Sequence, residues 1–226
     1  MNSAVIVAAG KGTRMGINVN KLFLELKSRP VIAHSWKAFD RNPNIDEIVL
    51  VVREDNKKEF QKVAEEYEFQ KPYRFAFGGN ERQDSVWNGI QKINHSEGLV
   101  AIHDGARPCV TQKVINDNLK SADKFGAAVS ATLLTDTIKQ TNDGQFISEH
   151  LDRSKLRCVQ TPQCFKVPVI KDALISAIES KRVFTDDTAA CQAIGQRVEL
   201  VISEDPNIKI TTPNDIPLAE LLVSEW

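Results

Sequence analysis

Cysteine is scarce in this sequence, and its few copies lack any paired spacing. The 226 residues contain four cysteines, at positions 109, 158, 164 and 191. Zinc sites and thioredoxin-like redox motifs need closely spaced cysteine pairs, so both are excluded. A disulfide scaffold is equally excluded, and the pattern is usual for a reduced cytosolic protein. We therefore expect a cytoplasmic location and interpret the cysteines, Cys164 included, as core residues.

Long hydrophobic runs and an excess of one charge are also missing. No apolar segment is long enough to cross a bilayer, and the first residues lead into a predicted strand without a signal-peptide pattern. Lys and Arg together number 29, Asp and Glu 30, and the net charge is −1. A general nucleic-acid-binding protein would carry a basic excess. We therefore expect no membrane and no nucleic acid as partner, and functional cations that are local to one site.

Apolar strands and amphipathic helices alternate over the first 134 residues. Helical spacing of Phe60, Val63, Ala64 and Tyr67, for example, predicts an amphipathic helix. This order predicts an α/β fold with a Rossmann-like, doubly wound and mostly parallel sheet, whose ligand binds at the carboxyl ends of the strands. Strands are predicted at 4–7, 47–52, 73–77, 99–102 and 127–134, and helices at 31–39, 54–69, after 85 and around 114–122.

A glycine-rich loop follows the first predicted strand. Residues 8–16 are Ala-Ala-Gly-Lys-Gly-Thr-Arg-Met-Gly, and Lys21 lies just beyond them. Gly10 and Gly12 allow backbone amides to approach phosphate oxygens, and Arg14 and Lys21 add positive charge. The spacing fits neither a Walker A loop nor the dinucleotide-binding Gly-x-Gly-x-x-Gly motif. A glycine-rich surface turn is the alternative, but the two cations favour a polyphosphate site.

Two further loops follow predicted strands and fall at the same edge of the sheet. Residues 78–85 are Gly-Gly-Asn-Glu-Arg-Gln-Asp-Ser, and residues 103–108 are His-Asp-Gly-Ala-Arg-Pro. Convergence of three loops predicts the site more strongly than any single motif. Asp104 could be a turn-capping residue, but its neighbours favour a role in the site. Arg82, next to acidic residues, is interpreted as a structural ion-pair member, and His103 as a buried residue.

The alternation breaks after residue 134. Polar-apolar alternation on both sides of Thr141-Asn142-Asp143-Gly144 predicts a β-hairpin, because Asp-Gly is a strong hairpin signal. A hairpin this polar cannot bury itself against its own domain. We therefore expect a single domain of residues 1–226, with an arm at about 135–153 that projects from it and meets a partner surface. After it we expect a connecting segment at 158–163, helices at 167–180 and from about 185, strands at 198–202 and 208–210, and a last helix capped by Thr212.

With these motifs assembled, the chain resembles the cytidylyltransferases that make CDP-sugar alcohols, most closely the 2-C-methyl-D-erythritol 4-phosphate cytidylyltransferases of non-mevalonate isoprenoid biosynthesis. The resemblance rests on Ala-Ala-Gly-x-Gly-x-Arg-Met, Gly-Gly-x-Glu-Arg-x-x-Ser-Val, His-Asp-x-Ala-Arg-Pro, Asp-Arg with Gln-Thr-Pro-Gln-x-Phe, Thr-Asp-Asp and Asn-Ile-Lys-Ile-Thr-x-Pro, in order from residue 8 to residue 213. It departs from the family at Asn20 and Leu22, which flank Lys21, at Asn80 and at Gly105.

The resemblance implies a reaction of CTP with methylerythritol phosphate that gives the CDP-alcohol and pyrophosphate, with Mg²⁺ as cofactor. Two alternatives stay open. D-Ribitol-5-phosphate cytidylyltransferases share the fold, the nucleotide and the mechanism. A non-catalytic nucleotide-binding regulator should have lost the cations that act on the transition state, whereas Arg14, Lys21 and Lys209 are all present.

The resemblance also implies roles for individual residues, with a homodimer in which the hairpin arm completes the neighbouring site. The catalytic cations are Arg14, Lys21, Arg153 and Lys209. Nucleotide-binding residues are Ala8, Ala9, Gly10, Gly12, Gly79, Asn80, Ser85 and Asp104, of which Asp104 is also the metal ligand. The sugar-alcohol phosphate is surrounded by Arg107, Thr137, Arg153, Thr161, Thr185 and Lys209.

Overall fold

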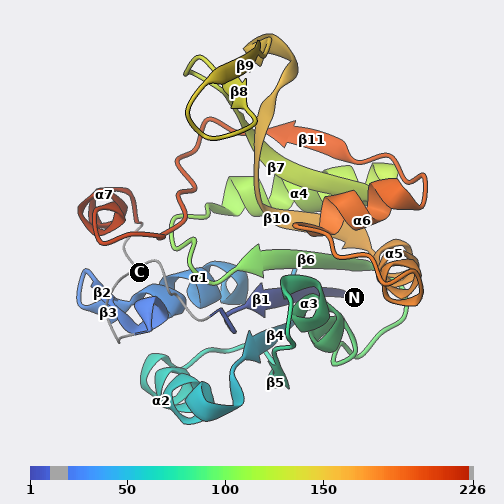
Figure 1. The fold of residues 1–226 in the computed structure, drawn as a ribbon. Coiled ribbons are helices and arrows are strands. Elements are labelled where there is room, and N and C mark those ends of the chain that lie inside the picture. The colour runs from blue at the N-terminus through green and yellow to red at the C-terminus, as the bar shows by residue number, and fades with distance from the viewer. Residues whose placement is uncertain (11–19, 224–226) are drawn as a thin grey trace.

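The computed structural model describes residues 1–10 and 20–223 and is built around a central sheet. Within these residues the strand order is β11-β7-β10-β6-β1-β4-β5 (Figure 1). Parallel pairing joins β1 to β4 and β6, β4 to β5, and β7 to β11, which confirms the mostly parallel α/β fold. The strands are β1 (Asn2–Val7), β4 (Glu47–Val52), β5 (Tyr73–Phe77), β6 (Leu99–Asp104), β7 (Ala127–Leu133), β10 (Arg157–Lys166) and β11 (Glu199–Ile202).

Helices cover both faces of this sheet, which explains why its strands are apolar at successive positions. On β1, Ala4 and Ile6 face one core and Val5 faces the other. The first core receives side chains from α1 (Val31–Asp40), α2 (Lys57–Tyr67), α4 (Gln112–Phe125) and α7 (Asp215–Leu222). The second receives them from α3 (Arg82–Ile90), α5 (Val167–Glu179) and α6 (Asp187–Ala193). The doubly wound arrangement therefore follows from the sequence pattern.

The first turn of α3 corrects the expected loop at 78–85. Glu81 is the N-cap, its side chain accepts from the backbone at Asp84, and Asp84 accepts from the Glu81 N–H, which forms a capping box. The helix therefore begins at Arg82. This start places the helix N-terminus, with its partial positive charge, directly after the glycines that follow β5.

Strand β10 was not predicted and lies inside the sheet, between β6 and β7. Residues 158–163, expected as a connection, belong to this strand of 10 residues, which runs antiparallel to both β6 and β7. Pro162 falls inside the register shift between Val159 and Gln163, so its missing N–H interrupts no regular ladder. Cys158 is exposed on this strand, contrary to the expected core position, whereas Cys109, Cys164 and Cys191 are buried.

The C-terminal segment departs from two further expectations. Residues 208–210 form no strand; instead the Ile210 N–H donates to the carbonyl of Ala106, 2.8 Å away. The last helix begins at Asp215, whose carboxylate accepts from the backbone N–H groups of Thr211 and Thr212, so Thr212 is not its cap. These bonds attach the segment to the loop after β6 rather than to the sheet.

The predicted hairpin is present as a separate antiparallel pair. Strands β8 (Lys139–Thr141) and β9 (Ile147–His150) pair only with each other within the described chain, and every residue in them is exposed. Asp143 closes the turn by accepting from the N–H groups of Gln145 and Phe146. In Figure 1 the hairpin stands beyond β7, away from the layered sheet.

The remaining described elements are short. A two-stranded sheet consists of β2 (Glu25–Leu26) and β3 (Arg29–Pro30), and three 3₁₀ turns are η2 (Lys21–Phe23), η3 (Glu54–Asn56) and η4 (Arg153–Lys155). No helix among the described residues has both the length and the apolar character needed to cross a membrane.

Gly89 of α3 packs against the sheet so closely that a methyl group would not fit. An added Cβ would lie 2.6 Å from Val5 Cγ1 and 2.8 Å from Val51 Cγ2. Gly89→Ala should therefore lower the free energy of unfolding by about 1–2 kcal/mol, because overpacking outweighs the gain of about 1 kcal/mol in helix propensity. Urea unfolding measures this loss.

Val5→Ala provides the matched test, because it removes the nearer of the two methyl groups that the new Cβ would strike. In the double variant Val5→Ala/Gly89→Ala, the loss should be smaller than the sum of the single losses by about 0.5 kcal/mol or more. Strict additivity would contradict the steric explanation.

Candidate active site

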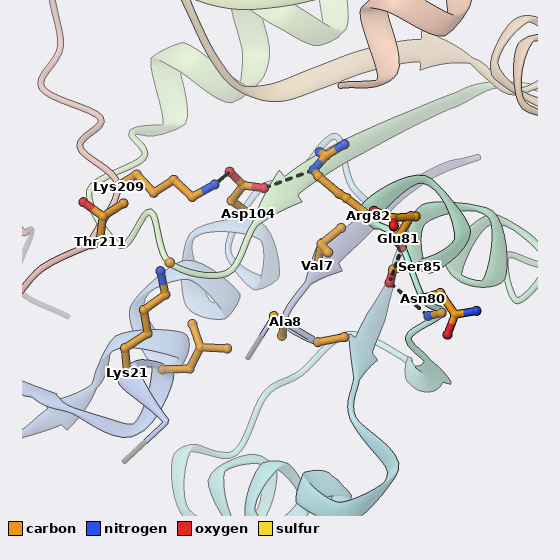
Figure 2. A pocket seen from close by; sticks show the side chains of 15 residues that line it. Val7, Ala8, Lys21, Asn80, Glu81, Arg82, Ser85, Asp104, Lys209 and Thr211 are labelled. Atoms are coloured by element: carbon orange, nitrogen blue, oxygen red, sulfur yellow. Dashed lines mark hydrogen bonds and ion pairs between the residues drawn. The ribbon is translucent and has the colours of Figure 1, made fainter. Parts of the chain in front are cut away.

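A cavity of about 490 Å³ opens at the carboxyl ends of β1, β5 and β6. This is the edge where the sequence predicts the ligand of a doubly wound sheet. Figure 2 shows its polar side chains converging from separate elements. Its lining residues are Val7, Ala8, Ala9, Gly10, Lys21, Leu22, Gly79, Asn80, Glu81, Arg82, Ser85, Asp104, Ala106, Lys209 and Thr211.

The loops after β1 and β5 pack directly on each other. A Cβ at Gly78 would lie 2.4 Å from the Cβ of Ala9, so only glycine allows this contact. The Gly79 N–H donates to Ser85 Oγ at 3.1 Å, and that hydroxyl donates to the Glu81 carbonyl at 3.2 Å. Ser85 therefore fixes the backbone of the second loop, which forms one wall of the cavity.

Asp104, the last residue of β6, is a carboxylate that lines the cavity and is surrounded by cations. Lys209 Nζ donates to its Oδ2 at 2.7 Å, Arg107 Nε lies 3.7 Å from Oδ2, and Arg82 Nε lies 3.6 Å from Oδ1. Burial alone would raise the pKa of this carboxyl, but Lys209 and Arg82 outweigh burial and lower the pKa to about 2. Asp104 is therefore anionic at neutral pH.

Lys21 and Lys209 reach the cavity through the C-terminal segment. Lys21 Nζ donates to the carbonyl of Ile210 at 2.7 Å, and Ile210 is itself bonded to the loop after β6. This segment carries Lys209 to Asp104 across 105 positions of sequence. Both lysines line the cavity, as the sequence resemblance implies.

Arg82 is a cavity residue that sequence reasoning assigned differently. The expected ion pair exists, but its partners are Asp187, at 2.8 Å, and Asp104, not the adjacent acidic residues. Glu81 and Asp84 are instead engaged in the capping box of α3. The Thr-Asp-Asp motif that contains Asp187 was the signal that could have indicated the distant partner.

Buried polar residues contact Asp104 on the side away from the cavity opening. The backbone N–H of Asp104 donates to Thr161 Oγ1 at 3.1 Å, and His103 Nδ1 lies 3.0 Å from the same hydroxyl. Arg107 donates to the carbonyl of Asn207 at 2.7 Å. Arg107 and Thr161, both expected to surround a phosphate, thus contact Asp104 and are buried rather than lining the cavity.

Other expected site residues lie elsewhere. Thr137 and Arg153 stand at the base of the hairpin, where Arg153 donates to the carbonyl of Thr135, and neither lines the cavity of its own chain. Thr185 is exposed just before α6. Gly12 and Arg14 lie outside the described residues.

These features together define a class of enzyme. A doubly wound sheet presents glycine-rich loops, lysine and arginine side chains and the anionic carboxylate of Asp104 in one cavity at its carboxyl edge. Such a site holds a nucleotide's phosphates and neutralises the charge that moves during their transfer, which is the work of a nucleotidyltransferase.

The family model described as 2-C-methyl-D-erythritol 4-phosphate cytidylyltransferase matches residues 2–225. The chain belongs to this family. A relative of that name from Clostridium acetobutylicum is 42% identical over 226 residues, which cover 100% of this chain and 98% of the relative. Another from Bacillus thuringiensis is 42% identical over 220 residues, covering 97% and 96% of the two chains.

Solved structures agree with this assignment. A 4-diphosphocytidyl-2C-methyl-D-erythritol synthase from Anaerococcus prevotii superposes with a TM-score of 0.86 at 28% identity, covering 97% of this chain and 94% of its own. The cytidylyltransferase from Thermus thermophilus superposes with a TM-score of 0.78 at 28% identity, covering 99% of each chain.

His103 makes the stability of this site dependent on pH. Burial lowers the pKa of His103 to about 4, below the 6.5 of an unperturbed histidine. Between these values the unfolded chain binds a proton that the folded chain does not. Stability should therefore fall as the pH drops from 6.5 to 4, and His103 alone should contribute a loss of about 3 kcal/mol.

Urea unfolding at several pH values measures this effect in the wild type and in His103→Gln. The variant should lose less stability over the same interval, because glutamine does not titrate. Equal slopes for the two proteins would contradict the assignment.

Proposed function

We propose that this protein transfers the cytidylyl group of CTP to 2-C-methyl-D-erythritol 4-phosphate, which gives 4-diphosphocytidyl-2-C-methyl-D-erythritol and pyrophosphate in isoprenoid biosynthesis. The observation that carries the proposal is the pair of cations Arg82 and Lys209 against Asp104, in a cavity that Lys21 also lines and whose other wall is glycine-rich backbone. We place the reaction in the cytoplasm, in keeping with cysteines that are all free.

The reaction needs positioning and charge neutralisation rather than a general base. A phosphate monoester loses its second proton near pH 6, so the attacking oxygen is already anionic at neutral pH. The barrier then comes from repulsion between two anions and from charge that develops at the α-phosphorus and on the departing pyrophosphate. His103 is buried and does not line the cavity, in keeping with the lack of a base.

Lys21 and Lys209 supply positive charge from the same side of the cavity. We propose that Lys21, together with Arg14, stabilises the five-coordinate α-phosphorus, and that Lys209 positions the attacking phosphate. Such contacts are stronger in the transition state than in the bound substrate, so they act on kcat more than on KM.

The residues of the cavity fit a magnesium ion held mainly by substrate. Among the described residues there is no cluster of three or more potential metal ligands, so the protein would supply few ligands, and Asp104 is the buried carboxylate that lines the cavity. Its Oδ1 accepts no hydrogen bond from the described chain, since Arg82 stays at 3.6 Å. Mg²⁺ commonly binds through one carboxylate together with substrate phosphates and waters. When bound it would neutralise charge on those phosphates, and Asp104 would hold it.

The loops after β1 and β5 offer contacts for the base. Cytosine differs from uracil by an exocyclic amine, a donor that backbone carbonyls accept. We propose that main-chain groups of Ala8, Gly79 and Asn80 and the Ser85 hydroxyl bind cytosine, with Ala9, Gly10 and Gly12 on the phosphates. Because main-chain atoms make the contact, Asn80 in place of the family's usual aspartate preserves it.

We further propose that residues 1–226 work as one domain whose hairpin arm, at about 135–153, completes the site of a second copy in a homodimer. The arm and the neighbouring strands expose large apolar side chains at Leu133, Phe146, Ile147 and Val159. Such exposure is unusual unless a partner covers it. Thr137 and Arg153 would then join Thr185 and Lys209 around the sugar-alcohol phosphate, with Arg107 and Thr161 holding Asp104 in place.

Pyrophosphate release from CTP, measured with a panel of alcohol phosphates, tests the reaction. Methylerythritol phosphate should support release, and Lys21→Ala should lower it through kcat while the KM for CTP changes little. Ribitol 5-phosphate is the substrate of the alternative function. Release with ribitol 5-phosphate alone would overturn the proposal.

The arm is tested by mixing two impaired proteins. Arg153→Ala should lose charge-assisted hydrogen bonds of about 1.5–3 kcal/mol, or roughly ten- to a hundredfold in kcat/KM. Lys21→Ala and Arg153→Ala proteins are unfolded and refolded together so that mixed dimers form. If the arm acts across the dimer, each mixed dimer contains one site with both substitutions and one site with neither. The intact site should raise the activity of the mixture above that of either parent protein.

A pair from one cavity provides the control. Lys21 and Lys209 line the same cavity of one chain, so mixing Lys21→Ala with Lys209→Ala leaves a defect in every site and should produce no gain. No gain from the Arg153→Ala mixture either would show that Arg153 acts within its own chain.

A further inference from the structure

The ion pair between Arg82 and Asp187 joins the nucleotide side of the cavity to α6. Arg82 Nη1 donates to Asp187 Oδ2 at 2.8 Å, and the Asp187 side chain is almost fully buried. The reaction as proposed assigns no role to Asp187. The pair nonetheless lies directly beside Asp104, because Arg82 Nε faces Asp104 Oδ1.

Both ends of this pair are held rigidly by neighbouring amides. Gln83, next to Arg82, donates to the carbonyl of Arg182 and accepts from the N–H of Phe184, each at 3.0 Å. On the other side, Gln163 of β10 accepts from the N–H of Asp187 at 3.1 Å. The start of α3 and the start of α6 therefore cannot shift independently, and the direction of the Arg82 side chain is set by Asp187.

If this ion pair serves only to stabilise the fold, the desolvation cost of burying its charges is high. A buried ion pair gains most when the guanidinium binds both carboxylate oxygens, whereas here Asp187 Oδ1 is buried with no hydrogen-bond partner among the described residues. Burial also raises the pKa of Asp187 despite the attraction of Arg82, so ionising this carboxyl carries a desolvation cost. An unsatisfied buried carboxylate oxygen beside a reaction cavity calls for a functional explanation.

The consequence for Asp104 is geometric. Its Oδ2 is occupied by Lys209 at 2.7 Å, whereas Arg82 remains 3.6 Å from Oδ1, beyond hydrogen-bond distance. Figure 2 shows Asp104 between these two cations. Without Asp187, Asp104 would be the nearest carboxylate left to Arg82, and a hydrogen-bonded pair would form that occupies Oδ1.

We propose that Asp187 is a positioning residue: by holding Arg82 back, it keeps Oδ1 of Asp104 open for the divalent cation that accompanies the nucleotide. This inference rests on the proposed function, since it assumes that a nucleotide–metal complex enters the cavity. It assigns a role to the last residue of the Thr-Asp-Asp motif.

Cation binding is measured without turnover, with Mn²⁺ as the probe and CTP present but no acceptor. The relaxation rate of water protons reports Mn²⁺ bound to the complex of the full chain with CTP. A sample with Mn²⁺ and CTP but no protein is the blank. Asp187→Asn should weaken Mn²⁺ binding about tenfold, the size of effect typical of residues that orient a metal ligand. CTP binding without any cation, measured by calorimetry, should change less than about threefold, because Asp187 does not line the cavity.

A double variant separates positioning from structural damage. Arg82→Gln removes the side chain that would cover Oδ1, so adding Asp187→Asn to Arg82→Gln should change the Mn²⁺ affinity by less than about threefold. Asp187→Ala, which deletes the acceptor entirely, should weaken binding at least as much as Asp187→Asn. A further loss of about tenfold when Asp187→Asn is added to Arg82→Gln would overturn the inference.

Asp186→Asn is the matched control for charge. It removes the same charge one residue away, while asparagine still accepts from the Ala189 N–H as the helix cap. Its Mn²⁺ affinity should stay near that of the wild type. An equal loss in Asp186→Asn, or no loss in Asp187→Asn, would overturn the role of Asp187. Failure of the wild type itself to bind Mn²⁺ with CTP would instead count against the proposed function.

Discussion

The carboxylate of Asp104 is the charge on which the site depends. Lys209, Arg82 and Arg107 come from separate segments of the chain and face it at 2.7–3.7 Å. Without this anion, the three cations would repel one another in a partly buried space, where charges are poorly screened. With Asp104 present, the three cations form a cluster whose net charge is still positive and can attract phosphates. The backbone bond from Asp104 to Thr161 fixes the carboxylate at the end of β6.

Strand β10 explains how the cluster is assembled. By inserting antiparallel between β6 and β7, it brings Thr161 beside Asp104 and Gln163 beside α6. The chain then reaches β11 at the sheet's far edge and must return past the carboxyl end of β6 to reach α7 (Figure 1). That return carries Asn207, Lys209 and Ile210, which bond to Arg107, Asp104 and Lys21.

The hairpin arm takes no part in the cavity of its own chain. Its strands are fully exposed, and its base carries Thr137 and Arg153 outside the cavity of the same chain. A polar two-stranded element has little stability of its own, and within the described chain the turn bonds of Asp143 help to fix its shape. Its strands pair with no other described strand, and this exposure supports the proposed contact with a second subunit.

Much of the fold was predictable because local patterns reflect burial. The strands at 47–52 and 73–77 match the predicted ranges: the first is a run of buried, mostly apolar residues, and the second is an edge strand rich in aromatic side chains. The glycines, Lys21 and Asp104 at the carboxyl edge were likewise indicated by their positions after strands, whereas Lys209 was indicated only by the family resemblance. The hairpin followed from Asp-Gly between alternating residues, which is a local turn preference.

Features that depend on contacts between residues far apart in the sequence were decided by the tertiary structure. Strand β10 escaped prediction because its interior is polar and contains Pro162, and only pairing on both sides makes it a strand. Arg82 was assigned to its sequence neighbours, whereas the fold offers it Asp187, 105 residues away. Residues 208–210 have the composition of a strand, yet their bonds go to Ala106 and Asp104. Sequence thus determined which residues are buried and where loops carry charge. Which charges meet was set by the packing of distant segments, because an ion pair depends on separation in space and not along the chain.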